Sequence, residues 1–223
     1  MDQQTLHFLS DLAEHNDREW FQENKKRYEA AKADMEELVG YLIREVGKFQ
    51  DLGNLEVKNC MLRIYRDVRF SKNKDPYKKN LAAGIGPGGK KSGKIDYYLQ
   101  VQPGDKTFLG GGMWETTSEE IARFRQEIDY NAGELKNIIE DKEFKKYFPE
   151  IHGETLKTMP KGYSKDHPEI ELLKRKELFF MHHYTDKEVA SKDFGKMVVK
   201  GIQLLKPFTD YMNYVLYEQH AEQ

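Results

Sequence analysis

The stretch IDYYLQVQPGDKTFLGGGMW, Ile95–Trp114, decides the fold class of this chain. Two segments within it, Ile95–Val101 and Thr107–Trp114, have the composition of β-strands. Between them, Pro103-Gly104-Asp105 supplies the residues of a tight turn. The stretch therefore predicts an antiparallel hairpin.

Helices are predicted on both sides of this hairpin. On the N-terminal side, Asn16 and Glu19 have the spacing of a capping box that starts a long helix. Its apolar residues recur at helical spacing, and they are Phe21, Tyr28, Ala31, Met35, Leu38 and Leu42. On the C-terminal side, Thr117 and Glu120 form a second such box. The sequence thus predicts an α+β fold: a mainly antiparallel sheet with helices from both chain ends packed on it.

We expect a single domain over residues 1–223. It would consist of a helical N-terminal part (about 3–50), a strand-rich part (about 58–114) and a helix/strand/helix C-terminal part (about 117–218). The lone Cys60 cannot form an internal disulfide, and no window reaches eighteen apolar residues or resembles a signal peptide. These features predict a soluble, cytoplasmic protein with no membrane partner.

Positive charge is concentrated in one segment. The whole chain has 36 basic and 38 acidic residues, a formal net charge of −2. Residues 58–94 hold 11 basic and 2 acidic residues, or +9, so the remainder holds 25 and 36, or −11. Such a segment either meets an anionic partner or is neutralised by the acids of its own chain.

The centre of this segment is RIYRDVRFSKNKDPYKKN, Arg63–Asn80. Apolar and polar residues alternate from 62 to 70, which predicts a strand with Leu62, Ile64, Val68 and Phe70 facing the core. Arg66 falls on the apolar side, where a guanidinium needs a partner. One reading of the stretch is an edge strand protected by charge, and the other is an anion-binding site.

The anion-site hypothesis assigns a role to each basic residue. Three arginines would clamp the ligand: Arg63, Arg66 and Arg69. Three lysines would attract it: Lys72, Lys74 and Lys78. Tyr77 or Tyr65 would donate a proton or a stacking surface, and Trp20 and Asn24 would complete the wall. The predicted partner is a small anion that carries phosphate or carboxylate.

Other chemistry is less well supported by the sequence. GIGPGGKKSG, Gly84–Gly93, matches the G-x-x-x-x-G-K core of a phosphate-binding loop, but it precedes a strand rather than a helix. It is predicted to be a basic connection that could close over a ligand. His182 and His183 are adjacent on a predicted strand and point to opposite faces, so no metal site is expected. No catalytic residue, cofactor or reaction follows from the sequence.

Four segments resemble a known family. They are NDREWFQENKKRYE (Asn16–Glu29), RIYRDVRFSKNKDPYKKN (Arg63–Asn80), GGGMW (Gly110–Trp114) and PKGYSKDHP (Pro160–Pro168). In this order they resemble the conserved hypothetical proteins called domain of unknown function 2461. That family often has Asp, Thr and His where this chain has Asn73, Asp75 and Asn80. The resemblance implies one compact domain and supplies no activity, but its most recognisable motif is polar and basic, which favours the anion site.

Three functions are therefore compared. The first is an anion-binding protein, with enzymatic activity left open. The second is a structural or interaction protein whose basic strand pairs with its own acidic helices. The third is a nucleic-acid-binding module, in which tyrosines stack on bases and cations follow the phosphates. The charge of −11 outside residues 58–94 disfavours a large nucleic-acid footprint.

Overall fold

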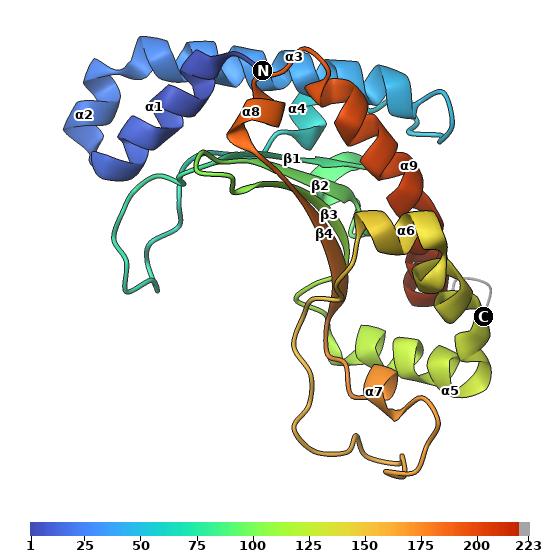
Figure 1. The fold of residues 1–223 in the computed structure, drawn as a ribbon. Helices are drawn as coiled ribbons and strands as arrows, with labels where there is room; N and C mark the ends of the chain where they lie inside the picture. Colours follow the sequence, from blue (N-terminus) through green and yellow to red (C-terminus); the bar gives the residue numbers. More distant parts are fainter. Residues whose placement is uncertain (219–223) are drawn as a thin grey trace. The chain divides into compact units, whose positions relative to one another are not determined.

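The computed structural model describes residues 1–218, and it confirms the predicted α+β fold (Figure 1). Four strands form one antiparallel sheet in the order β1-β2-β3-β4: β1 Leu81–Ile85, β2 Tyr97–Val101, β3 Thr107–Met113 and β4 Leu178–Tyr184. The hairpin predicted over Ile95–Trp114 is present as β2 and β3. Within residues 1–218, no helix has the length and apolar character needed to cross a bilayer.

The chain divides into two compact units. Unit 1 contains Met1–Leu109 and His183–Ile202, and unit 2 contains Gly110–His182 and the chain from Gln203 on. The third and fourth strands and the last α-helix, α9 (Phe194–Asn213), contribute residues to both units. The single domain over 1–223 stays a prediction, and its residues 219–223 lie outside the described part of the chain.

Unit 1 places helices over the first strands. They are α1 Gln3–Glu14, α2 Arg18–Glu23, α3 Lys25–Val46 and α4 Val57–Cys60, with α8 Asp186–Val189 from later in the chain. The helix α1 packs on α3, and α3 packs on β1 (Figure 1). Asp17, and not the predicted Asn16, caps α2 by accepting a hydrogen bond from the Trp20 amide. The predicted long helix is also interrupted, because Asn24 separates α2 from α3.

The strand predicted over residues 62–70 is wrong. This segment belongs to an irregular loop, residues 61–80, which we call the basic loop. Ile64 is buried, but Phe70 is 96% exposed. Two backbone bonds, from Lys78 N to Ile64 O and from Arg66 N to Pro76 O, tie its two arms together. These two bonds satisfy part of the backbone of the loop without a continuous ladder, so the alternating pattern does not require a sheet.

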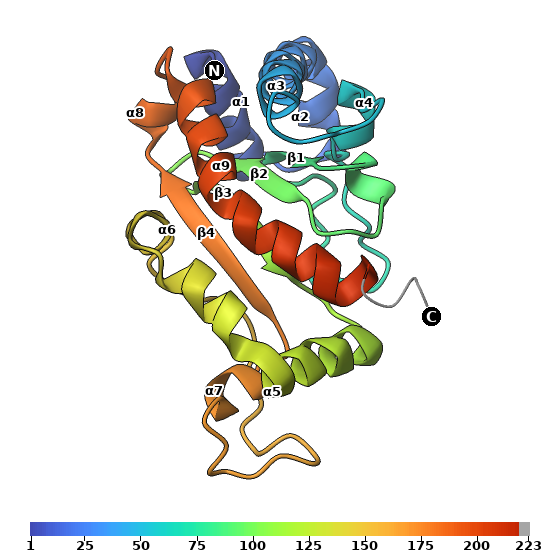
Figure 2. The same ribbon diagram turned by 90° about the vertical axis from the view of Figure 1, so that its right-hand side faces the viewer.

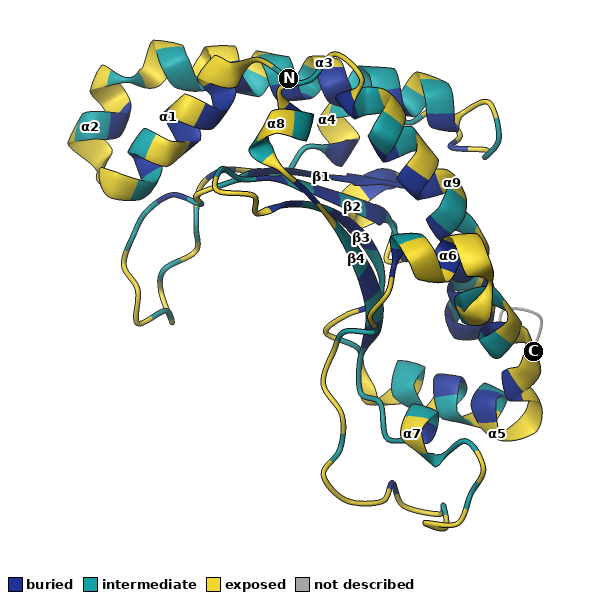
Figure 3. Cartoon of the chain, in the orientation of Figure 1, coloured by how far each residue is buried: buried dark blue, intermediate teal, exposed yellow. Residues whose placement is uncertain are grey.

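The true first strand, β1, has no alternation that would reveal it. All five of its residues are buried, whereas the basic loop is mostly exposed or half-buried (Figure 3). It pairs antiparallel with β2, from Leu81 opposite Val101 to Ile85 opposite Tyr97. A strand covered on both faces shows a continuous apolar run, which periodicity alone cannot assign.

Unit 2 is built around a cluster of phenylalanine rings. Its helices are α5 Ser118–Glu140, α6 Lys142–Tyr147 and α7 Ile170–Leu173, followed at the end of the chain by the π-helix η2 Tyr214–Glu218. The predicted capping box of Thr117 and Glu120 starts α5, and α7 lies against α5 (Figure 2). The ring of Phe180 meets those of Phe144 and Phe208 edge-on at 4.8 and 4.9 Å.

Two glycines of the GGGMW segment allow β3 and β4 to approach closely in unit 2. A Cβ at Gly110 would lie 2.6 Å from Phe180 O, and one at Gly112 would lie 2.4 Å from Leu178 O. Gly112 also has a φ of +141°, which side-chain-bearing residues rarely adopt. Glycine at these two positions thus leaves room for the backbone of β4.

Asp96, just before β2, is placed against glycine backbone in unit 1. A Cβ at Gly86 would lie 2.4 Å from Asp96 Oδ1, and one at Gly84 would lie 2.9 Å from Oδ2. The Oδ1 atom is buried and has no hydrogen-bond partner among the described residues. Burial therefore raises the pKa of Asp96 from 3.8 to about 6.

This burial predicts a pH-dependent stability. Because the folded state holds the proton more tightly than the unfolded chain, the stabilisation from Asp96 is complete below about pH 4 and is lost as the pH rises through about 6. The shift corresponds to at most about 3 kcal/mol of the free energy of unfolding. Asp96→Asn should remove this dependence, as measured by urea unfolding between about pH 4 and pH 8.

The matched control is Asp166→Asn, because Asp166 is exposed. The free energy of unfolding of this variant should depend on pH as that of the wild type does. Parallel curves for the wild type and Asp96→Asn over the same range would contradict the burial of an ionisable Asp96.

Candidate functional site

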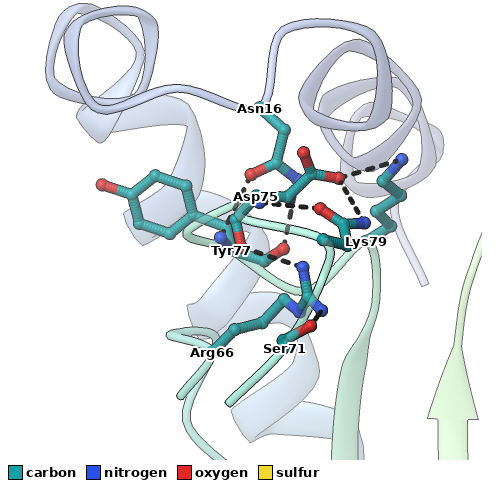
Figure 4. A network of polar contacts seen from close by, with 7 residues as sticks. Asn16, Arg66, Ser71, Asp75, Tyr77 and Lys79 are labelled. Atoms are coloured by element: carbon teal, nitrogen blue, oxygen red, sulfur yellow. Dashed lines mark hydrogen bonds and ion pairs between the residues drawn. The ribbon is translucent and has the colours of Figure 1, made fainter. Parts of the chain in front are cut away.

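One amide group anchors the basic loop to the N-terminal helices. Asn16, in the turn between α1 and α2, donates from Nδ2 to Tyr77 O and accepts at Oδ1 from Tyr77 N, both at 3.1 Å (Figure 4). The side chain thus satisfies both backbone groups of a residue 61 positions away. This two-point contact fixes both the place and the direction of the returning arm of the loop.

An aromatic stack supports the same contact. The rings of Tyr77 and Phe21 lie parallel, with centroids 3.9 Å apart and an interplanar angle of 12°. Tyr77 is only 3% exposed, and burial raises its pKa. The ring of Tyr65 lies 5.4 Å from that of Tyr77 and is 51% exposed. Of the two tyrosines considered in the sequence, Tyr65 is therefore the one whose ring a ligand can reach.

Arg66 cross-links the loop internally. Its Nη1 donates to Asp75 O at 2.9 Å and its Nη2 to Ser71 Oγ at 3.2 Å (Figure 4). The guanidinium has the partners that the sequence analysis required, although they are neutral oxygens rather than carboxylates. Arg66 thus holds the shape of the loop, and its positive charge also helps to lower the pKa of Asp75.

The two aspartates of the loop are neutralised within the loop. Arg69 binds Asp67 with Nη2 2.7 Å from Oδ2, and Lys79 lies 3.5 Å from Asp75 Oδ2. The hydrogen bond from Arg69 lowers the pKa of Asp67, and one from Asn73 lowers that of Asp75. Within residues 1–218, the ion pairs of the basic loop are these two, and neither involves an acid of a helix.

Arg63 and Lys78 are neighbouring cations that form no salt bridge in residues 1–218, although the charge of Arg63 also helps to lower the pKa of Asp67. Arg63 is exposed and Lys78 is half-buried, and neither forms an ion pair in the described chain. Burial lowers the pKa of Lys78, and the positive charge of Arg63 lowers it further. An anion between these two cations would relieve their repulsion.

The other predicted lysines lie toward the tip of the loop. Lys74 donates from Nζ to Val68 O at 3.0 Å and remains exposed. Lys72 is exposed as well, with no polar contact among the described residues. Both side chains are therefore accessible to an anion from solvent.

Trp20 and Asn24 belong to the helical support of the loop. The ring of Trp20 stacks on Phe8 at 6.1 Å and on His15 at 5.7 Å. Asn24 donates from Nδ2 to Trp20 O and accepts a bond from Arg27. Their predicted role as a wall of the ligand site stays a prediction, because the contacts of both residues lie within the N-terminal helices.

The glycine-rich connection is shorter than predicted, because Gly84 and Ile85 belong to β1, and its residues 86–93 are held against α4. Lys90 donates from Nζ to Lys58 O and Met61 O at the C-terminal end of that helix. A Cβ at Gly89 would lie 2.7 Å from Asn59 O, so only glycine allows this contact. In residues 1–218, no cluster of three or more His, Cys, Asp or Glu side chains could hold a metal ion.

Comparison with known families identifies the chain. The model of one family, described as "Conserved hypothetical protein (DUF2461)", matches residues 4–211. The chain belongs to this family, in agreement with the resemblance of its motifs. No curated protein and no solved structure matches it.

The anchor of the basic loop predicts a local instability in Asn16→Ala. This variant loses both bonds to the backbone of Tyr77, so we expect the free energy of unfolding to fall by about 1–3 kcal/mol. Limited proteolysis should also cut the basic loop first, because its returning arm is released.

Asn54→Ala is the matched control, since Asn54 is exposed and lies outside the loop. If Asn16→Ala were as stable and as protease-resistant as this control, the amide would not anchor the loop.

Proposed function

We propose that this member of the DUF2461 family binds a small ligand bearing phosphate or carboxylate at the basic loop. Arg63 and Lys78 would contact the anionic group, with the exposed ring of Tyr65 beside it. The observation that carries the proposal is the half-buried ammonium of Lys78, which lies within electrostatic range of Arg63 and has no acid paired to it in residues 1–218.

Electrostatics explains why these two residues would bind an anion. Burial disfavours the charge of Lys78, and the like charge of Arg63 disfavours it again. A bound anion would offset both effects, because its negative charge attracts both cations in a site partly removed from water. The planar guanidinium adds two parallel donors that match the oxygens of a phosphate or carboxylate.

The remaining charged residues of the loop have supporting roles in this proposal. Arg66 fixes the shape of the loop, and Arg69 is occupied by Asp67. Lys72 and Lys74 would raise the local concentration of anions by long-range attraction. The alternative of a basic strand that pairs with acidic helices has no supporting contact, since the ion pairs of the loop in residues 1–218 are internal.

A thermal-shift screen tests the proposal. The panel contains sulfate, pyrophosphate, nucleotides, sugar phosphates and dicarboxylates, each at low and high salt. A ligand at about one hundred times its Kd adds about 2.7 kcal/mol of stability. For a chain of this size, such a gain raises Tm by several degrees, at about 2–4 °C per kcal/mol.

Arg63→Gln and Lys78→Gln should each weaken binding of the best anion about ten-fold or more, measured by titration calorimetry. Neither variant should lose stability, because each removes one of two cations that repel each other. Lys106→Gln is the matched control, an exposed lysine in the turn between β2 and β3. If both loop variants bound the anion as tightly as the control, the proposed site would be wrong.

The lowered pKa of Lys78 also predicts how binding depends on pH. Only the ammonium form attracts the anion, so affinity should fall as the pH rises through a value below the ordinary 10.5 of lysine. Anion binding should raise this pKa, and proton uptake on binding would show it. In Lys78→Gln, affinity should be constant over the same range, since arginine stays charged. An unchanged profile in that variant would assign the titration to another group.

A further inference from the structure

Phe70 is the most exposed of the large apolar side chains in the described chain, at 96%. It lies toward the tip of the basic loop, between Arg69 and Ser71, and the fold gains no core packing from it. An apolar ring fully in water is a surface on which a partner can gain free energy by covering it. Phe70 is therefore the residue of the loop that the anion site leaves unexplained.

Several hydrogen bonds connect the residues around Phe70. Ser71 N donates to Val68 O, Lys74 Nζ donates to the same oxygen, and Arg66 holds Ser71 Oγ. Asn73 and Asp75 exchange two further bonds, from Asn73 Nδ2 to Asp75 Oδ2 and from Asp75 N to Asn73 Oδ1. Such bonds restrict the backbone that carries the ring, which lowers the loss of conformational freedom when a partner binds.

The exposed ring of Phe70 and the cations near it favour a partner that carries both negative charge and a planar ring. The guanidinium of Arg69 lies 5.9 Å from the centre of the ring and leaves most of it uncovered. Lys72 and Lys74 add positive charge close by in the sequence, and both residues are exposed. An aromatic ring with cations around it is how sequence-tolerant proteins hold single-stranded nucleic acid, with the base on the ring and the phosphates on the cations.

Two groups of cations occur along the loop. Arg63 and Lys78 form the pair at its base, and Lys72 and Lys74 lie toward its tip. Phe70 lies seven positions after Arg63, so even a fully extended arm spans at most about 25 Å. Cations at both the base and the tip of the loop offer positions for more than one phosphate of a chain. The charge of −11 outside residues 58–94 limits this chain to a few nucleotides.

We propose that the anion bound at the basic loop is the phosphodiester backbone of a short single-stranded nucleic acid, one base of which stacks on Phe70. This inference rests on the proposed function, because the Arg63 and Lys78 pair would hold one of the phosphates. It adds the class of ligand and a binding residue that the anion site alone does not need.

The test measures fluorescence anisotropy of labelled eight-nucleotide strands, (rU)8 and (dT)8, with the full chain. The wild type should bind, and the logarithm of its binding constant should fall linearly with the logarithm of salt concentration. Phe70→Ala should weaken binding about ten-fold, whereas Phe70→Trp should retain it, since tryptophan also stacks on bases. Lys78→Gln should reduce the salt slope by about one phosphate contact.

Tyr130→Ala is the matched control, because Tyr130 is an aromatic residue of unit 2 that is 89% exposed. It should bind both strands as the wild type does. Equal affinity of Phe70→Ala and this control would overturn the stacking role and with it the inference.

Two further measurements separate this inference from the proposed function. Pyrophosphate should bind Phe70→Ala as tightly as the wild type, because the ring is not part of the anion pair. If the wild type bound pyrophosphate but neither (rU)8 nor (dT)8, the nucleic-acid inference would be wrong and the anion site would be retained. If neither pyrophosphate nor the strands bound, both would fall. Binding to phosphatidylserine vesicles that depends on Phe70, without binding to the strands, would replace the inference with a membrane-surface role.

Discussion

The contact between Asn16 and the backbone of Tyr77 is the constraint on which the rest of the site depends. A single side chain satisfies an N–H and a C=O that the irregular loop cannot pair internally. Once this arm is fixed, the ring of Tyr77 can stack on Phe21, and Arg66 can reach across to Asp75 O. The loop thereby has a defined shape without belonging to a sheet.

This shape divides the charges of the loop into two classes. Both aspartates are bound by neighbours within the loop, which lowers their pKa values, and they form no salt bridge with Arg63, Arg66 or Lys78 in residues 1–218. Arg66 uses its donors on neutral oxygens, and Arg63 and Lys78 form no ion pair in the described chain. A chain with a net charge of −2 thus presents a local surface that attracts anions.

Much of the fold could be predicted from the sequence, and the site only in part. The hairpin over Ile95–Trp114 and the Thr117 capping box rest on local signals, and both are present. The first strand could not be found, because Leu81–Ile85 is buried on both faces and does not alternate. Residues 62–70 do alternate, but their hydrogen bonds close a loop. The partner of Asn16 lies 61 residues away, and no local pattern encodes such a contact.

The glycines of β3 also restrict the register in which that strand can pair with β4. Cβ atoms at Gly110 and Gly112 would lie 2.6 and 2.4 Å from carbonyl oxygens of β4. A slip of one residue in either direction would bring Leu109 or Met113 to a position where only hydrogen fits. Strand pairing usually depends on which face is apolar. Here steric exclusion acts as a second, independent check, so a mispaired sheet cannot form without displacing the backbone.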